Sequence, residues 1–150
     1  MSVITNPVWF ESSRPMSLGL MLPIGEESHF GPTPRFTDMV EMAQAAREVG
    51  FEAIWFADHF LFEDADDGRI RGVWEVFSMM AAVAAAVPDV QIGSLVACTG
   101  FRNPALIAKT AESIDEISGG RFILGLGAGW HKPEYDAFGY PWDHRGSRFE

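Results

Sequence analysis

The chain has 150 residues, of which 47% are hydrophobic, and its formal net charge at neutral pH is −10. This composition supports one ordinary hydrophobic core, while the acidic balance makes nucleic acids and anionic membranes poor partners. Cys98 is the single cysteine, which excludes an intrachain disulfide and a cysteine metal cluster, and no apolar run approaches the roughly 18 residues of a membrane span.

The first 16 residues differ from the rest of the chain. They contain Pro7 and Pro15 without hydrophobic periodicity, and Met16 stands directly before the first good strand. We expect residues 1–16 to form an irregular N-terminal extension; a start codon assigned too early, with Met16 as the true start, explains them equally well. They lack the basic and apolar regions of a secretory signal, so we expect a cytoplasmic protein.

Residues 17–150 are interpreted as four strand–helix units. Apolar runs predict the strands, and N-cap and glycine signals delimit the helices between them. The expected strands are Ser17–Pro23, Glu52–Asp58, Val90–Cys98 and Arg121–Gly127. The expected helices run from Thr33 as N-cap to Gly50, from about Trp74 to Val87, and from Asn103 and Pro104 to Gly119 and Gly120, with Leu106, Ile107, Ala111, Ile114 and Ile117 on one face of the last.

The spacing of these units predicts a parallel α/β fold. Successive strands begin about 30 to 40 residues apart, which is the length of a strand–helix–strand crossover. The strands are apolar almost throughout, which indicates burial on both faces. An open doubly wound sheet and an eight-stranded barrel both satisfy this pattern. A complete barrel usually needs about 250 residues.

The end of the fourth strand is rich in glycine. Gly125, Gly127 and Gly129 are followed by Trp130 and His131. Glycines at a strand C-terminus let another body approach the backbone, so we expect a flat or phosphorylated ligand here; tight packing against the protein itself is the alternative. The spacing is not a dinucleotide fingerprint, because Trp130 occupies the position of its last glycine.

Asp58 and His59 follow the second strand and are the first catalytic candidates. A carboxylate beside an imidazole suits general acid–base chemistry. Adjacent residues in a strand point in opposite directions, so Asp58 either orients His59 or anchors the loop. Thr99 and the backbone near it are candidates for a phosphate or a ring edge, and we expect the lone Arg102 to be exposed to solvent.

The remaining polar clusters have simpler interpretations. The acidic run from Glu63 to Asp67, which includes Asp66, is expected to be a solvated loop. Glu26, Glu27 and His29 have no second ligand cluster at a suitable spacing, so no metal site is expected. The last 20 residues are expected to form a loop that lines a pocket or acts as a lid, with the candidates His131, Tyr135, Trp142, His144 and Arg145.

Three segments resemble the luciferase-like flavin monooxygenases, a family that includes deazaflavin-dependent oxidoreductases. They are SLGLMLP, GFEAIWFADHF and the long run from VQIGSLVACTG through GAGWHKPEYDAFG to the end, which together cover most of residues 17–150. The resemblance implies a (β/α)₈ barrel that binds reduced FMN or the deazaflavin coenzyme F420 at the strand C-termini. It places Asp58 and His59 beside the reactive ring and implies a cis peptide bond between Leu95 and Val96.

The resemblance also implies a coenzyme-binding set and a reaction class. The implied coenzyme-binding residues are Leu95, Val96, Cys98, Thr99, Gly127, Ala128, Gly129 and Trp130. Sugar-phosphate dehydrogenases of the family carry a carboxylic acid at the position of Trp130, which argues against that activity here. The EYDAFG segment leans toward the deazaflavin branch. The implied function is oxidation or reduction of a small organic substrate, using reduced FMN and O₂ or F420, by a homodimer that receives FMN from a flavin reductase.

Because the chain ends at Glu150, where the family begins another barrel helix, we expect a truncated barrel containing about the first four units. The alternative function is a non-catalytic half barrel that needs a partner chain to complete its fold. An open-sheet nucleotide-binding domain is a third interpretation. It needs a glycine-rich turn after the first strand, where Pro23–Glu27 supplies one glycine and two acids.

Overall fold

The computed structural model describes residues 16–26, 31–64 and 67–149. The expectations for residues 1–15, for Glu27 and His29, and for Asp66 lie outside these described residues. Within them, no helix is long and apolar enough to cross a membrane.

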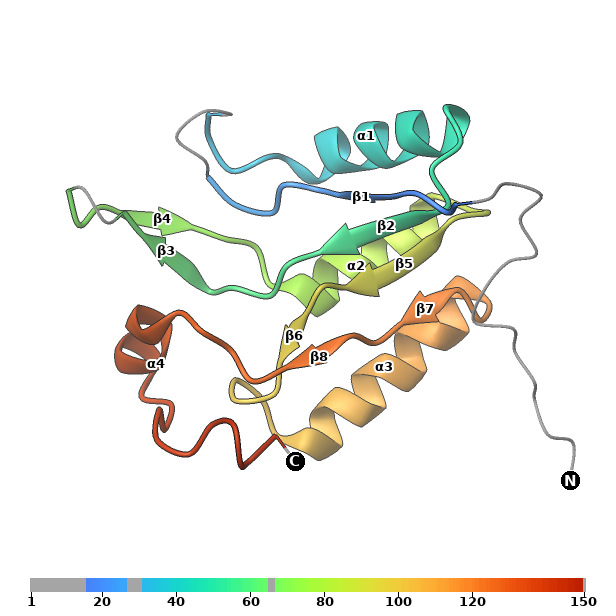
Figure 1. Ribbon diagram of the computed structural model, residues 1–150. Helices are drawn as coiled ribbons and strands as arrows, with labels where there is room; N and C mark the ends of the chain where they lie inside the picture. The colour runs from blue at the N-terminus through green and yellow to red at the C-terminus, as the bar shows by residue number, and fades with distance from the viewer. Residues whose placement is uncertain (1–15, 27–30, 65–66, 150) are drawn as a thin grey trace, which may run out of the picture.

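Four parallel strands form the central sheet. They are β1 (Gly19–Met21), β2 (Ala53–Phe56), β5 (Gln91–Ser94) and β7 (Phe122–Ile123), and they lie side by side in that order (Figure 1). Each strand therefore neighbours the next one along the chain. A doubly wound sheet reverses its strand order part-way, whereas a barrel does not. The topology is that of four successive units of a parallel α/β barrel, as the resemblance implied.

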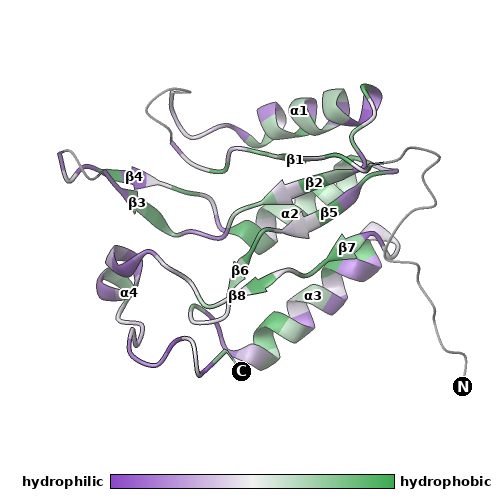
Figure 2. Cartoon of the chain, viewed as in Figure 1, coloured by the Kyte–Doolittle hydropathy of each residue, from purple (hydrophilic) through white to green (hydrophobic). Residues whose placement is uncertain are grey.

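Three helices cover the sheet, as predicted. They are α1 (Phe36–Glu48), α2 (Val76–Ala86) and α3 (Pro104–Ser118), and α2 contacts both of the others (Figure 1). No residue of α2 is charged, and Figure 2 shows it pale to green along its length. A helix enclosed by a sheet and two neighbouring helices buries most of its circumference, which explains this composition. The core lies between these helices and the sheet.

The helix boundaries correct one prediction and confirm another. Helix α1 begins at Phe36 with Arg35 as its N-cap, so Thr33 is not the cap; the Thr33 hydroxyl donates to the Gly72 carbonyl at 3.4 Å instead. Helix α3 begins as predicted, with the Asn103 side chain accepting from the Ala105 amide at 2.9 Å. It ends at Gly119, whose φ of +66° favours glycine.

The predicted apolar face of α3 is only partly buried. Ile107 and Ile114 contribute to the core, whereas Leu106 and Ile117 are 57% and 48% exposed. Figure 2 shows hydrophilic and hydrophobic patches alternating along this helix. Fewer apolar side chains of α3 are buried in the core than its apolar periodicity predicts.

The third and fourth predicted strands each divide in two. After β5 the chain continues as β6 (Ala97–Cys98), and after β7 it continues as β8 (Leu126–Gly127); β6 and β8 pair in parallel. The peptide bond Leu95–Val96, at the break between β5 and β6, is cis, as the resemblance implied. The C-terminal parts of the third and fourth strands therefore form a separate two-stranded sheet instead of continuing the central one.

Two further elements stand at this edge, and the sequence patterns did not predict them. The expected acidic loop connects β3 (Leu61–Glu63) and β4 (Ile70–Gly72), which pair as an antiparallel hairpin, and the segment expected to be an aromatic loop contains α4 (Lys132–Phe138). Both lie beyond the C-terminal ends of the sheet strands (Figure 1). Helix α4 contributes Glu134 to the lining of the candidate site, and Phe62 of β3 contacts His59, which also lines it.

Candidate active site

A pocket of about 240 Å³ opens at the C-terminal edge of the sheet. The two catalytic candidates and the implied coenzyme-binding residues all line it except Thr99, and Ala57, Phe101 and Glu134 also contribute. The predicted residues in the lining are Asp58, His59, Leu95, Val96, Cys98, Gly127, Ala128, Gly129 and Trp130. Residues from three separate strand ends and from α4 therefore meet at one place.

The Leu95–Val96 dipeptide presents apolar surface to this pocket. The two side chains are 49% and 41% exposed, although they follow a strand whose last residue, Ser94, is fully buried. Trp130 is 67% exposed at the same pocket. Such surface suits a flat, largely apolar ligand better than a strongly charged one.

The glycines of the fourth strand are required by packing within the protein. A Cβ atom on Gly125 would lie 2.3 Å from the Ser94 carbonyl oxygen, and one on Gly127 would lie 2.5 Å from a Val96 methyl group. A Cβ on Gly129 would lie 2.2 Å from the Tyr135 hydroxyl, and Gly129 has a φ of +78°. The packing alternative therefore explains these residues, and ligand approach is not needed to account for them.

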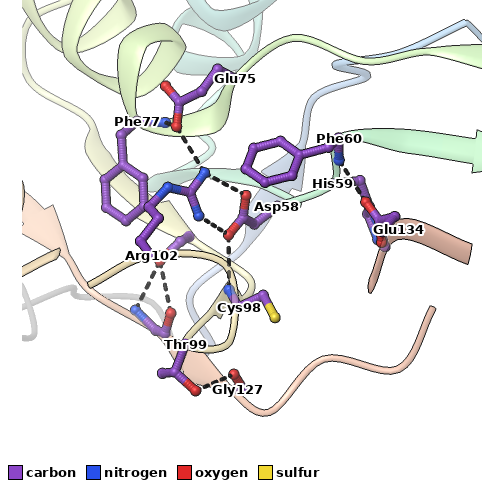
Figure 3. A network of polar contacts seen from close by, with 12 residues as sticks. Asp58, His59, Phe60, Glu75, Phe77, Cys98, Thr99, Arg102, Gly127 and Glu134 are labelled. Atoms are coloured by element: carbon purple, nitrogen blue, oxygen red, sulfur yellow. Dashed lines mark hydrogen bonds and ion pairs between the residues drawn. The ribbon is translucent and has the colours of Figure 1, made fainter. Parts of the chain in front are cut away.

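Asp58 is a structural anchor. Its carboxylate receives two hydrogen bonds from the Arg102 guanidinium, at 2.6 and 2.9 Å, and one from the Cys98 amide at 2.8 Å (Figure 3). The side chain points toward Arg102, while His59 points toward Glu134. Of the two roles weighed for Asp58, the geometry supports the loop anchor.

The prediction that Arg102 is exposed is wrong, because its side chain is only 10% exposed. Its guanidinium also donates to Glu75, at 2.8 Å, and lies 5.1 and 4.7 Å from the ring centroids of Phe60 and Phe77. Burial works to lower the pKa of Arg102, but the ion pairs with Asp58 and Glu75 outweigh it and raise the pKa. Arg102 therefore stays charged and joins the ends of β2, α2 and α3.

His59 has a different partner. Its Nδ1 lies 2.9 Å from Oε2 of Glu134, a side chain that is only 1% exposed. The imidazole also contacts Phe62, with ring centroids 4.3 Å apart, and meets Trp130 edge-on at 5.6 Å. The ring is thus held from two sides while its residue lines the pocket, which is the arrangement a proton-transferring group needs.

Cys98 and Tyr135 form a short hydrogen-bond chain beside the pocket. The Tyr135 hydroxyl donates to the Ala128 carbonyl at 2.8 Å and lies 3.0 Å from the Cys98 sulfur. Burial raises the pKa of the Cys98 thiol, and burial likewise raises the pKa of Tyr135 well above its ordinary value. Both groups remain protonated at neutral pH, so Cys98 is a poor nucleophile.

The other residues predicted to line a pocket or form a lid are not among those that line this pocket; they are His131, Tyr135, Trp142, His144 and Arg145. The Arg145 guanidinium donates to the Gly129 carbonyl at 3.1 Å and lies 3.7 Å from the Trp142 ring centroid. His131 accepts from the Glu63 amide at 3.4 Å. The Thr99 hydroxyl donates to the Gly127 carbonyl at 3.2 Å and joins β6 to β8. These side chains therefore bind other parts of the protein and not the space that a ligand would occupy.

Glu134 is the functional candidate that the sequence patterns missed. One signal was present: Pro133 followed by an acidic residue is typical of the first turn of a helix. Recognising α4 would have placed Glu134 at its start. Its contact with His59, 75 residues earlier in the chain, is visible only in three dimensions.

Comparison with known proteins identifies the family. The model of the luciferase-like monooxygenase family matches residues 16–150. The chain belongs to this family. The match begins at Met16 and includes all the elements that form the pocket, so the site described above lies within the region shared with other luciferase-like monooxygenases.

Two curated proteins illustrate what this chain is similar to in sequence. The F420-dependent glucose-6-phosphate dehydrogenase of Amycolatopsis mediterranei is 38% identical over 133 residues, covering 86% of this chain. The pyrimidine monooxygenase RutA of an Enterobacter species is 35% identical over 147 residues, covering 89%. The chain spans 38% of the length of each of these relatives.

Among solved structures, an F420-dependent secondary alcohol dehydrogenase in complex with an F420–acetone adduct superimposes with a TM-score of 0.70 at 26% identity. That match covers 88% of this chain and 37% of the dehydrogenase. These proteins are oxidoreductases, and the agreement in fold supports the barrel topology read from the strand order.

Proposed function

We propose that this chain provides a coenzyme-binding and proton-transfer site of an oxidoreductase that acts on a small organic substrate. The observation that carries the proposal is the pocket itself, where an apolar surface and a supported imidazole meet at the strand C-termini. The relatives named above divide between F420-dependent enzymes and a monooxygenase, so F420 and reduced FMN are both candidates for the coenzyme.

The residues present fit the ring portion of such a coenzyme. Leu95 and Val96 offer half-exposed apolar surface for a planar ring, and the backbone from Gly127 to Trp130 borders it. The volume of 240 Å³ is below the roughly 300 to 1,000 Å³ typical of complete small-molecule sites, so these residues hold part of the ligand. When bound, the coenzyme supplies hydride transfer, or oxygen activation in the case of reduced FMN.

The protein supplies orientation, exclusion of water and a proton. His59 is proposed as the proton donor or acceptor, and Asp58 fixes the loop that carries it. Trp130 stands where the family's sugar-phosphate dehydrogenases carry a carboxylic acid, which argues against a sugar phosphate as the substrate. A homodimer and, for FMN, a separate flavin reductase remain part of the proposal.

Coenzyme binding is tested by titrating the chain with FMN and with F420 while coenzyme fluorescence is recorded. We expect saturable binding of one of them, weakened at least tenfold by Leu95→Glu. Leu106→Glu, which alters an equally exposed leucine on α3, is the matched control. A folded chain that binds neither coenzyme would favour the non-catalytic half barrel, and size-exclusion chromatography of the same samples measures the oligomeric state.

The chemistry is tested with His59→Gln. Loss of general acid–base catalysis lowers turnover by about 10² to 10⁴-fold. We expect turnover to fall in this range while coenzyme binding is retained. Turnover with reduced F420 under anaerobic conditions supports direct hydride transfer, whereas O₂ uptake with reduced FMN supports the monooxygenase reaction.

A further inference from the structure

Glu134 is a buried carboxylate with both oxygens engaged by the segment that carries His59. Its Oε1 accepts from the Phe60 amide at 2.5 Å and from the Leu61 amide at 3.4 Å. Its Oε2 lies 2.9 Å from His59 Nδ1. The two amide contacts fix which oxygen faces the backbone, and so they fix which oxygen faces the imidazole.

We propose that Glu134 is a positioning residue that sets the tautomer of His59 and makes Nε2 its reactive atom. A carboxylate oxygen only accepts hydrogen bonds, so the contact at Nδ1 places the ring proton on Nδ1. A neutral imidazole has one N–H, which leaves Nε2 with its lone pair free to accept a proton. The tautomer is inferred from the hydrogen-bond geometry of a carboxylate; only the reaction assigned to Nε2 rests on the proposed function.

The other groups around the ring do not compete for Nδ1. Asp58 is adjacent in sequence, but its carboxylate is bound to Arg102 and the Cys98 amide. His131 is the other titratable side chain beside the ring, with its centroid 6.1 Å away, and its Nε2 accepts from the Glu63 amide. Phe62 and Trp130, which also contact the imidazole, are apolar or donate only through the indole N–H.

The substitution Glu134→Gln makes a sharp test because it reverses one hydrogen bond and keeps the others. The glutamine carbonyl oxygen is needed by the Phe60 and Leu61 amides, which turns the NH₂ group toward His59. An NH₂ group only donates, so Nδ1 must become the acceptor and the proton must move to Nε2. The substitution is therefore expected to switch the tautomer of His59 with little change in shape.

The experiment is ¹⁵N NMR of histidine-labelled chain at a pH where the imidazole is neutral, because protonated and unprotonated ring nitrogens differ widely in chemical shift. The chain has four histidines, and His59→Gln assigns the signal of interest. We expect wild-type His59 to carry its proton on Nδ1 and the Glu134→Gln variant to carry it on Nε2. Asp136→Asn, a matched loss of one charge on the exposed side of α4, should leave the wild-type pattern.

A wild-type His59 protonated on Nε2 overturns the proposal, and so does an unchanged tautomer in folded Glu134→Gln. The wild-type spectrum decides the matter by itself if that variant does not fold. Because the measurement needs neither coenzyme nor turnover, its result is separate from the coenzyme titration. A chain that shows the expected tautomer but binds no coenzyme retains this inference and loses the proposed function.

Discussion

Asp58 and Glu134 are both buried carboxylates at the same edge of the sheet, but their partners differ. Asp58 binds a guanidinium and Glu134 binds an imidazole. Arginine cannot lose its charge in a protein, whereas histidine gains and loses a proton near neutral pH. The first pair is therefore a permanent joint between elements, and the second is able to take part in proton transfer. Asp58 and His59 are neighbours in one loop, but the first stabilises the fold and the second is available for the proposed proton transfer.

The largest effect is expected from Asp58→Asn. The asparagine removes the buried charge that faces Arg102, whose side chain is only 10% exposed, and leaves the half-exposed Glu75 as its remaining carboxylate partner. Removing one partner of a buried ion pair costs about 3 to 5 kcal/mol. Urea unfolding followed by tryptophan fluorescence measures the change. A loss below about 1 kcal/mol would contradict the role of Asp58 as a structural joint.

Glu134→Gln makes the same chemical change in the other pair and is expected to cost less. The imidazole of His59, unlike a guanidinium, carries no permanent charge that the substitution would leave unbalanced, and the glutamine oxygen still accepts from the Phe60 amide. The expected loss in the free energy of unfolding is about 1 kcal/mol, because a hydrogen bond between neutral groups replaces the stronger one that the carboxylate makes. Measured in the same urea series, a loss equal to that of Asp58→Asn would remove the distinction between the two carboxylates.

Glu75→Gln tests the second ion pair of Arg102, which it makes with Glu75. Glu75 is the N-cap of α2, accepting from the Ser78 amide at 2.8 Å, and the glutamine keeps an acceptor but loses the charge at the helix N-terminus and beside Arg102, at a cost of up to about 1 kcal/mol. Burial raises the pKa of Glu75, but the hydrogen bonds from Ser78 and Arg102 outweigh it, so the pKa is lowered below 4.5. The unfolded chain therefore binds the proton more tightly, and this stabilisation is lost as the pH falls.

Urea titrations of wild type and Glu75→Gln at several pH values check the sign of this effect. The difference in unfolding free energy should be complete above pH 4.5 and should shrink as the pH falls through the lowered pKa of the folded state. A difference that grows toward acid pH would mean that Glu75 is not ionised in the cap.

The smallest effect is expected from Asp136→Asn on α4. Its pair with Lys132, at 2.6 Å, is exposed, with side chains 61% and 53% accessible. Exposed i,i+4 pairs contribute about 0.3 to 0.5 kcal/mol. The unfolding free energy should change by no more than this in low salt and by less in high salt. A larger loss would show that α4 depends on its surface charges rather than on the buried Glu134 and Tyr135.

The long elements of the fold were predictable and the short ones were not. Continuous apolar runs identified the strands, and Asn103 with Pro104 identified the start of α3, because these signals act over neighbouring residues. The β3–β4 hairpin and α4 are too short to be stable by local preference. They are held by contacts with each other and with the sheet edge, as the bonds from the residue 60–61 backbone to Glu134 illustrate.

For the site, the sequence by itself determined that Asp58 and His59 stand at a strand C-terminus and, through alternation, that Asp58 need not contact His59. The resemblance added the set of residues that meets around the pocket. Only the tertiary structure decided their partners: Arg102 lies 44 residues from Asp58, and Glu134 lies 75 residues from His59. Such pairs leave no periodic signal, because chain folding and not local spacing brings their charges together.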